Sequence, residues 1–204
     1  MNERTLLHVG CGPQRKAQTT PAFNTPAWRE LRLDIDPSVQ PDILGTMTDM
    51  SAVADQSVDA IFSSHNIEHL YPFEVPVALR EFRRVLKPDG FVVLTCPDLQ
   101  SVAEIIAADK LLETIYTSSL GPISAIDIVY GHRSAMAKGN LYMAHRCGFT
   151  IRALVGVLTE MGFANVAGRR RRTHLDLWAL AMVNGSEDQA KALAAEHWPA
   201  QQPG

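Results

Sequence analysis

Residues 6–13, LLHVGCGP, decide the fold predicted for this chain, because an apolar run leads directly into two glycines. The apolar residues leave little room for a solvated face, as expected for a buried central strand of a parallel sheet. Gly10 and Gly12 remove side chains where the backbone turns sharply or where a ligand approaches it closely. The stretch predicts a first strand that ends in a glycine turn, a place where doubly wound folds hold nucleotide-like ligands.

An acidic residue further along the chain strengthens this interpretation, because a lone G-x-G occurs in many loops. Asp34 lies 22 positions after Gly12, in the segment LDIDP that ends the second apolar stretch. An acidic side chain about 20 residues after the glycines can accept hydrogen bonds from ribose hydroxyls. Together the two motifs predict a nucleoside-binding edge of the sheet.

The rest of the chain alternates between apolar runs and amphipathic segments, which indicates a parallel α/β sheet. Strands are expected near residues 30–35, 42–45, 57–63, 91–95, 164–170 and 175–183, and helices near 70–86, 99–108 and 151–161. The last two strands are close in sequence, so one of them is expected to insert antiparallel. The predicted fold is a doubly wound, mostly parallel, seven-stranded Rossmann-like sheet with a cap inserted after strand five.

Some segments do not fit regular elements. The stretch 13–28 is polar and broken by two prolines, which predicts a loop or irregular turn instead of a first helix. Residues 86–90, LKPDG, predict a turn. We expect residues 1–184 to form a single domain in which residues 110–148 are the cap. Residues 185–204 are expected to be a polar tail with a frayed helix.

Composition restricts the class of protein. The chain has 204 residues, 46% of them apolar, and a net charge of −3, which argues against partners such as nucleic acid or an anionic membrane. Residues 169–172, four arginines, are a local exception that we interpret as a solvated strand end or turn.

Cysteine usage and hydropathy bear on location. Cys11, Cys96 and Cys147 are scattered, with neither metal-ligand nor disulfide spacing, so we expect a reducing, cytoplasmic setting. The start of the chain has no secretory signal pattern, and no uncharged run is long enough to span a bilayer.

A family resemblance rests on five motifs in a fixed order: HVGCGP, LDIDP, TDM, SVDAIFSSHNIEHL and REFRRVLKPDGFVVLTCPD. In this order they resemble class I S-adenosylmethionine-dependent methyltransferases, and most of all the branch of the ubiquinone- and menaquinone-biosynthesis methyltransferases. The resemblance covers about residues 5–183 and is poorest in the cap. Many members keep a third glycine after G-C-G, where this chain has Pro13 and Gln14.

The resemblance implies S-adenosylmethionine as the cofactor and a set of residues around it. That set is Gly10, Cys11, Gly12, Asp34, Ile35, Asp49, Met50, Ser64 and His65. Within it, Asp34 would bind the ribose hydroxyls and Asp49 would accept from the adenine amino group. Ile35 and Met50 would lie beside the adenine ring, and the end of strand four, with His65, would lie near the sulfonium. Cys11 can also be read as a small packed residue.

Methyl transfer itself leaves no diagnostic catalytic residue, because the protein chiefly aligns the acceptor and excludes water. An oxygen or nitrogen acceptor must also lose a proton, which a histidine can take. The N/D-P-P-Y/F/W motif of methyltransferases that act on nucleic-acid bases and glutamine is absent after strand four. A small-molecule acceptor is therefore expected.

The cap is the expected acceptor site, since it departs most from the shared pattern. It concentrates side chains that can stack on a ring or exchange a proton, namely Tyr116, Tyr130, His132, Tyr142 and His145. Gly131 lets the backbone bend between its neighbours, so Tyr130 and His132 join His65 as the predicted catalytic residues. The alternative is that these side chains pack the cap onto the sheet or form a homodimer contact.

Three rival functions stay open. Residues 65–69, HNIEH, match the H-x-x-E-H zinc signature, but the motif directly follows a strand without a convincing partner glutamate, so we assign no metal. A nicotinamide-dependent dehydrogenase would typically have the motif G-x-G-x-x-G, but Arg15 occupies the position of its third glycine. A methyltransferase-like domain without activity, serving as a cofactor sensor or binding partner, is the third.

Overall fold

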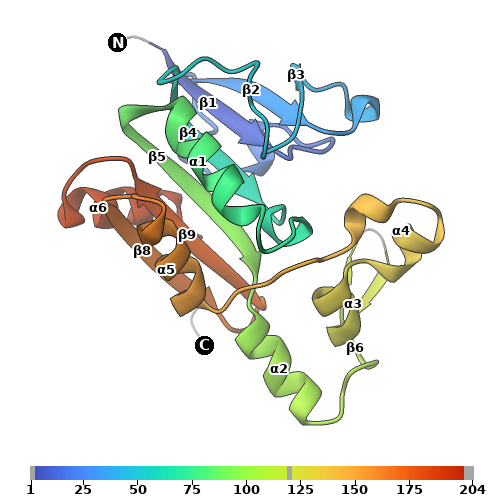
Figure 1. Ribbon diagram of the computed structural model, residues 1–204. Helices are drawn as coiled ribbons and strands as arrows, with labels where there is room; N and C mark the ends of the chain where they lie inside the picture. Colours follow the sequence, from blue (N-terminus) through green and yellow to red (C-terminus); the bar gives the residue numbers. More distant parts are fainter. Residues whose placement is uncertain (1–2, 119–120, 200–204) are drawn as a thin grey trace.

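A seven-stranded sheet forms the centre of the computed structural model, which describes residues 3–118 and 121–199. The strand order is β3-β2-β1-β4-β5-β9-β8, with β9 antiparallel to both of its neighbours (Figure 1). The strands are β1 (Arg4–Val9), β2 (Trp28–Asp34), β3 (Ile43–Leu44), β4 (Val58–Ser64), β5 (Leu86–Pro97), β8 (Asn165–Arg171) and β9 (Asp176–Met182). The predicted fold class, including the antiparallel insertion, is confirmed.

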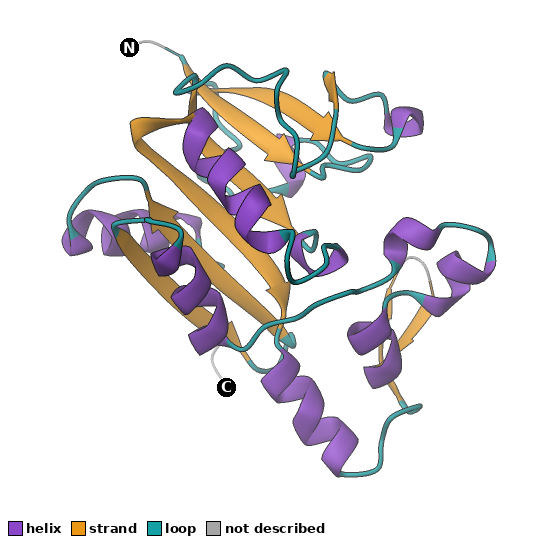
Figure 2. Ribbon diagram, viewed as in Figure 1, coloured by secondary structure: helices purple, strands orange, loops and turns teal. Residues whose placement is uncertain are grey.

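Helices cover both faces of this sheet, because successive strand residues point to opposite sides. Leu7 and Val9 of β1 join one apolar cluster with helices α1 (Val75–Val85) and α5 (Ile151–Glu160). Leu6 joins the other cluster, on the face covered by α6 (Glu187–His197). Figure 2 shows α1 and α5 in front of the sheet and α6 behind it.

The connection from β1 to β2 has only a single 3-10 turn, η1 (Lys16–Gln18), in its described structure. This agrees with the loop predicted from the prolines of this segment. Phe23 fills the space on the sheet face instead: it is fully buried, with its ring 5.0 Å from that of Trp28 and 4.2 Å from that of His197. The loop is thereby tied to the C-terminal helix.

Two boundaries differ from the sequence predictions. Helix α1 begins only at Val75, because Pro76 fits the first turn of a helix and not its interior. The LKPDG segment is part of β5 instead of a separate turn. Leu86 pairs with Val58 and Phe91 pairs with Ala60, so the intervening residues bulge out of the ladder.

The C-terminal segment is more ordered than the frayed tail expected from its polarity. Ser186 caps α6 by accepting from the Gln189 amide, and Ala190, Ala194 and His197 are buried on the sheet. A helix was expected here, but its burial on the sheet was not, because small alanines with one histidine give a weak apolar signal.

The arginine run is also better partnered than a solvated strand end. Arg170 lies 2.8 Å from the fully buried Asp98, which itself caps α2 (Leu99–Ala107). Arg171 pairs with Asp176, and Arg172 pairs with Glu104. These ion pairs neutralise most of the run, and those of Arg170 and Arg172 join the sheet to α2.

The cap follows α2 and lies beside the end of the sheet where β4 and β5 terminate (Figure 1). It contains β6 (Thr114–Ser118), β7 (Gly121–Ser124), α3 (Ala125–Tyr130), α4 (Arg133–Ala137) and the 3-10 turn η4 (Leu141–Met143). Two further 3-10 turns, η2 (Pro37–Val39) and η3 (Ile67–His69), follow β2 and β4. Among the described residues, none of the helices has the length and apolar character needed to cross a bilayer.

Candidate active site

The glycine-loop cavity, of about 440 Å³, opens at the carboxyl ends of β1, β2 and β4. Seven of the nine residues assigned to the cofactor line it: Gly10, Cys11, Gly12, Asp34, Ile35, Ser64 and His65. The cavity therefore lies where ligands bind in open α/β sheets, outside the carboxyl ends of the strands.

The glycine turn has a steric requirement as well as a conformational one. Gly10 and Gly12 have φ values of 63° and 52°, which side chains rarely adopt. A Cβ at Gly10 would lie 2.2 Å from Oδ1 of Asn66. Asn66 in turn donates to the carbonyls of Val9, at 3.2 Å, and Ser64, at 2.9 Å, and so joins the ends of β1 and β4. Sequence reasoning missed Asn66, whose signal was a polar residue directly after strand four.

Asp34 occupies the position expected for it but is already bound to the backbone. Its Oδ2 accepts from the Gly12 amide at 2.7 Å, and Oδ1 accepts from the Asp36 amide at 2.9 Å. A carboxylate oxygen can accept more than one hydrogen bond. Asp34 can therefore fix the glycine turn and still accept from a ligand hydroxyl.

Arg32 is a second residue that sequence reasoning missed. Its side chain is 1% exposed, yet it carries a charge. The guanidinium donates to four carbonyls, those of Gly12 (2.5 Å), Gln14 (3.1 Å), Val39 (3.1 Å) and Gln40 (2.8 Å). It therefore joins the glycine loop to the loop after β2, in a region that lacks a full helix. The only signal was an arginine inside an otherwise apolar strand end.

The two remaining cofactor assignments are not brought to the cavity. Asp49 is exposed outside it and accepts from the Ser51 amide, while Met50 is 1% exposed in the core. The reason is a tight turn in which Thr46 pairs with Asp49 and reverses the chain. Thr46 and Met47 line the cavity in their place.

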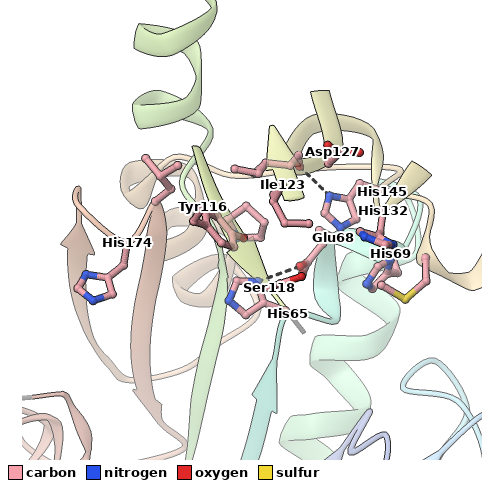
Figure 3. Close-up of a pocket in the computed structure, with 14 residues that line it drawn as sticks. His65, Glu68, His69, Tyr116, Ser118, Ile123, Asp127, His132, His145 and His174 are labelled. Carbon is pink, nitrogen blue, oxygen red and sulfur yellow. Dashed lines mark hydrogen bonds and ion pairs between the residues drawn. The ribbon is translucent and has the colours of Figure 1, made fainter. Parts of the chain in front are cut away.

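The cap cavity, of about 230 Å³, adjoins the first one and is lined by residues of the cap, of η3 and of the turn before β9. Five histidines line it: His65, His69, His132, His145 and His174. His65, His69 and Met143 line both cavities. Figure 3 shows the side chains that surround the cap cavity.

Glu68 lies among these histidines with its side chain 1% exposed (Figure 3). Neither of its carboxylate oxygens accepts a hydrogen bond of normal geometry from the described residues, although Nδ1 of His65 lies 3.5 Å from Oε1. Burial alone would raise the pKa of Glu68, but His65, His69 and His145 outweigh burial and lower it. Burial would likewise lower the pKa of His65, but the Glu68 carboxylate, 3.5 Å from its Nδ1, outweighs burial and raises it.

His65 lines both cavities and has a left-handed backbone conformation. Half of its side-chain surface is accessible, and its φ is 54°. Its amide donates to the Thr95 carbonyl at 2.9 Å, which anchors the end of β4 on β5. Only a single 3-10 turn follows, over Ile67–His69, so His65 and His69 do not share a helix face as an H-x-x-E-H zinc helix requires.

The cap places only one of its two predicted catalytic residues in a cavity. Tyr130 is 62% exposed and lines neither cavity, whereas His132 lines the cap cavity. Gly131, with φ of 97°, turns the chain so that the residues on either side of it diverge. The aromatic rings that do reach the cavities are Tyr116, in the cap cavity, and Tyr142, in the glycine-loop cavity.

An internal ion pair holds the cap together. Asp127 accepts from Nε of Arg133 at 2.7 Å and from the Ser124 hydroxyl at 2.6 Å. Burial would raise the pKa of Asp127, but these hydrogen bonds outweigh it and lower the pKa. The cap is therefore a structured element and not a loose insertion.

Comparison with known proteins agrees with this arrangement. A protein-family model described as a methyltransferase domain matches residues 7–94, which span β1 to β5 up to Leu94. A search of curated protein sequences finds no match.

Solved structures share the fold at low sequence identity. The 1,6-didemethyltoxoflavin N1-methyltransferase of Burkholderia thailandensis, solved with 1,6-didemethyltoxoflavin and S-adenosylhomocysteine, is 14% identical with a TM-score of 0.56. The match covers 89% of this chain and 71% of that one. An S-adenosylmethionine-dependent methyltransferase from Archaeoglobus fulgidus is also 14% identical, with a TM-score of 0.58. That match covers 89% of this chain and 86% of the other. The domain match covers less than half of the chain, and the solved structures show that the chain shares the fold of S-adenosylmethionine-dependent methyltransferases.

Proposed function

We propose that the protein transfers a methyl group from S-adenosylmethionine, bound in the glycine-loop cavity, to a small-molecule acceptor in the cap cavity. The observation that carries the proposal is the shared wall of the two cavities at His65, His69 and Met143. A cofactor whose nucleoside lies against β2 would present its other end to this wall. The free cysteines support a reducing, cytoplasmic setting for the reaction.

The residues of the glycine-loop cavity fit such a cofactor. Asp34 offers carboxylate lone pairs for ribose hydroxyls, and Ile35, 43% exposed, offers an apolar surface for a base. Thr46 and Met47 replace Asp49 and Met50 in our assignment of the adenine end. When bound, the cofactor supplies a methyl group made electrophilic by its sulfonium, and the chain needs only to align an acceptor with it.

His65 is the base that we assign to the acceptor. It lies on the wall between the cavities, and Glu68 holds its ring from one side at 3.5 Å. An acceptor hydroxyl or amine would lose its proton to His65 while its lone pair attacks the methyl carbon, and the electron pair of the broken bond would stay on sulfur. His132 is a further polar contact for the acceptor, and Tyr130 is removed from the catalytic set.

The acceptor class follows from the lining of the cap cavity. Five histidines and two acidic residues line a volume of about 230 Å³ together with apolar side chains such as Ile123, Ile128 and Leu175, which favours a compact acceptor that carries a polar group. The motifs that carry the resemblance to the quinone-biosynthesis branch include His65, Glu68 and His69 of this lining but none of its cap residues. We therefore propose a small polar molecule with an oxygen or nitrogen nucleophile.

Cofactor binding is tested by calorimetry with S-adenosylmethionine and S-adenosylhomocysteine. We expect wild-type protein to bind both, and Asp34→Ala to weaken binding by about tenfold or more, since a hydrogen bond to a charged group contributes roughly 1.5–3 kcal/mol. Asp49→Ala is the matched control, because it removes an aspartate outside the cavity and should leave the affinity unchanged. The absence of binding to folded wild-type protein would end the cofactor assignment.

Transfer is tested with labelled S-adenosylmethionine and a screen of small polar acceptors. With an acceptor in hand, His65→Gln should slow transfer by about 10²–10⁴-fold while the affinity for S-adenosylhomocysteine stays nearly the same. Tyr130→Phe should transfer at the wild-type rate. Tight cofactor binding without transfer to any acceptor would favour the alternative, a cofactor-binding domain without activity.

A further inference from the structure

Three side chains near the wall between the two cavities bring together atoms that can each bind a metal ion. Glu68 contributes a carboxylate oxygen, and His69 and His145 each contribute a ring nitrogen, all within 4.8 Å of one another. Both oxygens of Glu68 are without a hydrogen-bond partner among the described residues. Burial of an unpaired carboxylate is costly unless a cation or hydrogen-bond donor compensates it.

Backbone contacts determine which nitrogen each histidine presents. Nδ1 of His69 lies 3.1 Å from the Ala144 carbonyl, and Nδ1 of His145 lies 2.7 Å from the Ile128 carbonyl. A carbonyl oxygen only accepts, so in both rings Nδ1 carries the proton. Nε2 of each neutral ring then has a free lone pair. A histidine that donates its other nitrogen to a carbonyl is the usual arrangement of a metal ligand.

The three residues are held in place by the chain on both sides of the cluster. The amides of Arg146 and Cys147 donate to the Glu68 carbonyl at 2.8 Å and 3.2 Å, so the irregular segment that returns from the cap lies along η3. His145 thus reaches Glu68 from a segment more than 70 residues away in the sequence. Figure 3 shows the Glu68 carboxylate between the rings of His65 and His145, with His69 beside it.

We propose that Glu68, His69 and His145 bind one divalent transition-metal ion, for which zinc fits best, with its open coordination position facing the cap cavity. Two imidazoles and one carboxylate with an open position form a known type of catalytic zinc site. Ligand atoms 2.0–2.1 Å from a tetrahedral ion lie about 3.3 Å apart. Atoms now within 4.8 Å therefore need to approach by at most about 1.5 Å.

The site also suggests what the ion would do, a role that rests on the methyl transfer proposed above. A hydroxyl or carboxylate oxygen of the acceptor would occupy the open position, and the ion would make loss of a hydroxyl proton easier. The acceptor class would then narrow to small molecules with an oxygen that can coordinate a metal. The ion-binding site itself does not depend on this role.

Metal binding is tested on the untagged full-length protein after treatment with a chelator. Titration with Zn²⁺ should show one tight site per chain, and Co²⁺ should give the visible absorption bands of a tetrahedral site. His69→Ala, His145→Ala and Glu68→Gln should each weaken Zn²⁺ binding by at least about 100-fold, more than is typical of residues that only orient a ligand. Glu68→Gln keeps the shape of the side chain, so it protects the test against misfolding.

His174→Ala is the matched control, because His174 lines the same cavity but lies outside the cluster. It should bind Zn²⁺ like the wild type. Failure of the folded wild-type protein to bind Zn²⁺, or equal binding by His145→Ala, would overturn the proposal. So would dependence on His65 and His69 without His145, which would indicate the H-x-x-E-H pairing instead.

The same preparations separate this proposal from the proposed function. If Zn²⁺ restores transfer to the stripped protein without changing the affinity for S-adenosylhomocysteine, both are supported. Zn²⁺ binding in a protein that transfers no methyl group supports the metal site and argues against the proposed function. Transfer that proceeds fully in a protein unable to bind Zn²⁺ overturns the metal site and leaves the function intact.

Discussion

Arg32 and Glu68 are both charged, both 1% exposed, and treated in opposite ways by the fold. The guanidinium of Arg32 donates to four carbonyls around the glycine loop. The carboxylate of Glu68 accepts no hydrogen bond of normal geometry from the described residues. One buried charge is fully satisfied by its own chain and the other is not.

This difference indicates that Arg32 stabilises the fold, whereas Glu68 belongs to a ligand-binding site. Arg32 holds together the loops after β1 and β2, in a region without a full helix, because its guanidinium pairs carbonyls that would otherwise lack donors. At the wall between the two cavities, the buried Glu68 carboxylate lacks a hydrogen-bond donor of normal geometry among the described residues. Buried polar groups without partners are typical of ligand-binding sites. The comparison predicts that loss of Arg32 harms the fold, whereas loss of the Glu68 charge harms only function.

The largest effect is expected for Arg32→Met. Removing the guanidinium leaves four carbonyls without donors, and breaking a buried charged network typically costs about 3–5 kcal/mol of unfolding free energy. Urea denaturation measures this loss, and cofactor titration should weaken with it. Arg32→Lys keeps the charge but lacks the planar fork, so it should recover only part of the stability. If Arg32→Met lowered the unfolding free energy by less than about 1 kcal/mol, the hydrogen bonds of Arg32 would not be needed for the fold.

A second buried titratable group, His197, extends the comparison to pH. Its Nδ1 lies 2.8 Å from the Thr20 hydroxyl, and burial together with the charge of Arg4 lowers its pKa to about 4. Above the ordinary pKa of 6.5, His197 is neutral in both folded and unfolded chains and has no effect. Below it, the unfolded chain takes up the proton first. Stability should therefore fall by about 3 kcal/mol between pH 6.5 and pH 4.

His197→Gln isolates this contribution from the other groups that titrate in the same range. The difference in unfolding free energy between wild type and variant should change by about 3 kcal/mol over that interval, in favour of the variant at low pH. Denaturant unfolding at several pH values gives the difference. A constant difference across the range would mean that His197 takes its proton equally well in the folded chain.

Gly131→Ala tests whether the cap scaffold positions the cluster around Glu68. A Cβ at Gly131 would lie 1.9 Å from the Met143 carbonyl oxygen, so the segment that carries His145 must shift. We expect a stability loss of about 1–3 kcal/mol and weaker Zn²⁺ binding. Gly139→Ala is the control, because its φ of 94° is similar but no atom lies within 4 Å of the added Cβ. Equal effects of the two changes on Zn²⁺ binding would show that the backbone at Gly131 does not position Glu68, His69 and His145.

The smallest effect is expected for Glu68→Gln in metal-free protein. The amide can donate to a histidine nitrogen of the cluster but loses the attraction of the histidines that lowers the pKa of Glu68, so stability should change by less than about 1 kcal/mol. Glu30→Gln is the matched control, since Glu30 already pairs with Nδ1 of His8 at 2.9 Å and should lose stability when its charge is removed. Thermal unfolding of both variants measures the contrast. A larger loss of stability for Glu68→Gln would show that the carboxylate is already satisfied in the folded chain.

Local patterns were enough to predict much of the fold and several residues that line the glycine-loop cavity. The buried strand before Gly10, the spacing to Asp34 and the end of β4 at Ser64 all depend on residues close together in sequence, and all meet at the glycine-loop cavity. Asp49 and Met50 do not line the cavity, because a four-residue turn that carries no strong signal decides which side chains face it.

The cap side could be predicted only in outline. That the cap contributes to a cavity with His132 agrees with the analysis of the sequence, but Tyr130 points elsewhere because the left-handed backbone at Gly131 redirects the chain. His145 belonged to a group of candidate side chains, and nothing in the sequence joined it to Glu68. Arg32 and Asn66 were missed because their partners are backbone groups of other segments.

The sequence by itself determined the order of strands and helices, the glycine turn and the acidic end of β2, because periodicity and backbone freedom are local properties. Only the tertiary structure decided which buried charges found partners. That outcome depends on carbonyls, amides and rings brought together from η3, the cap and the loops after β1 and β2. Arg32 is satisfied and Glu68 is not, and no pattern of neighbouring residues distinguishes the two.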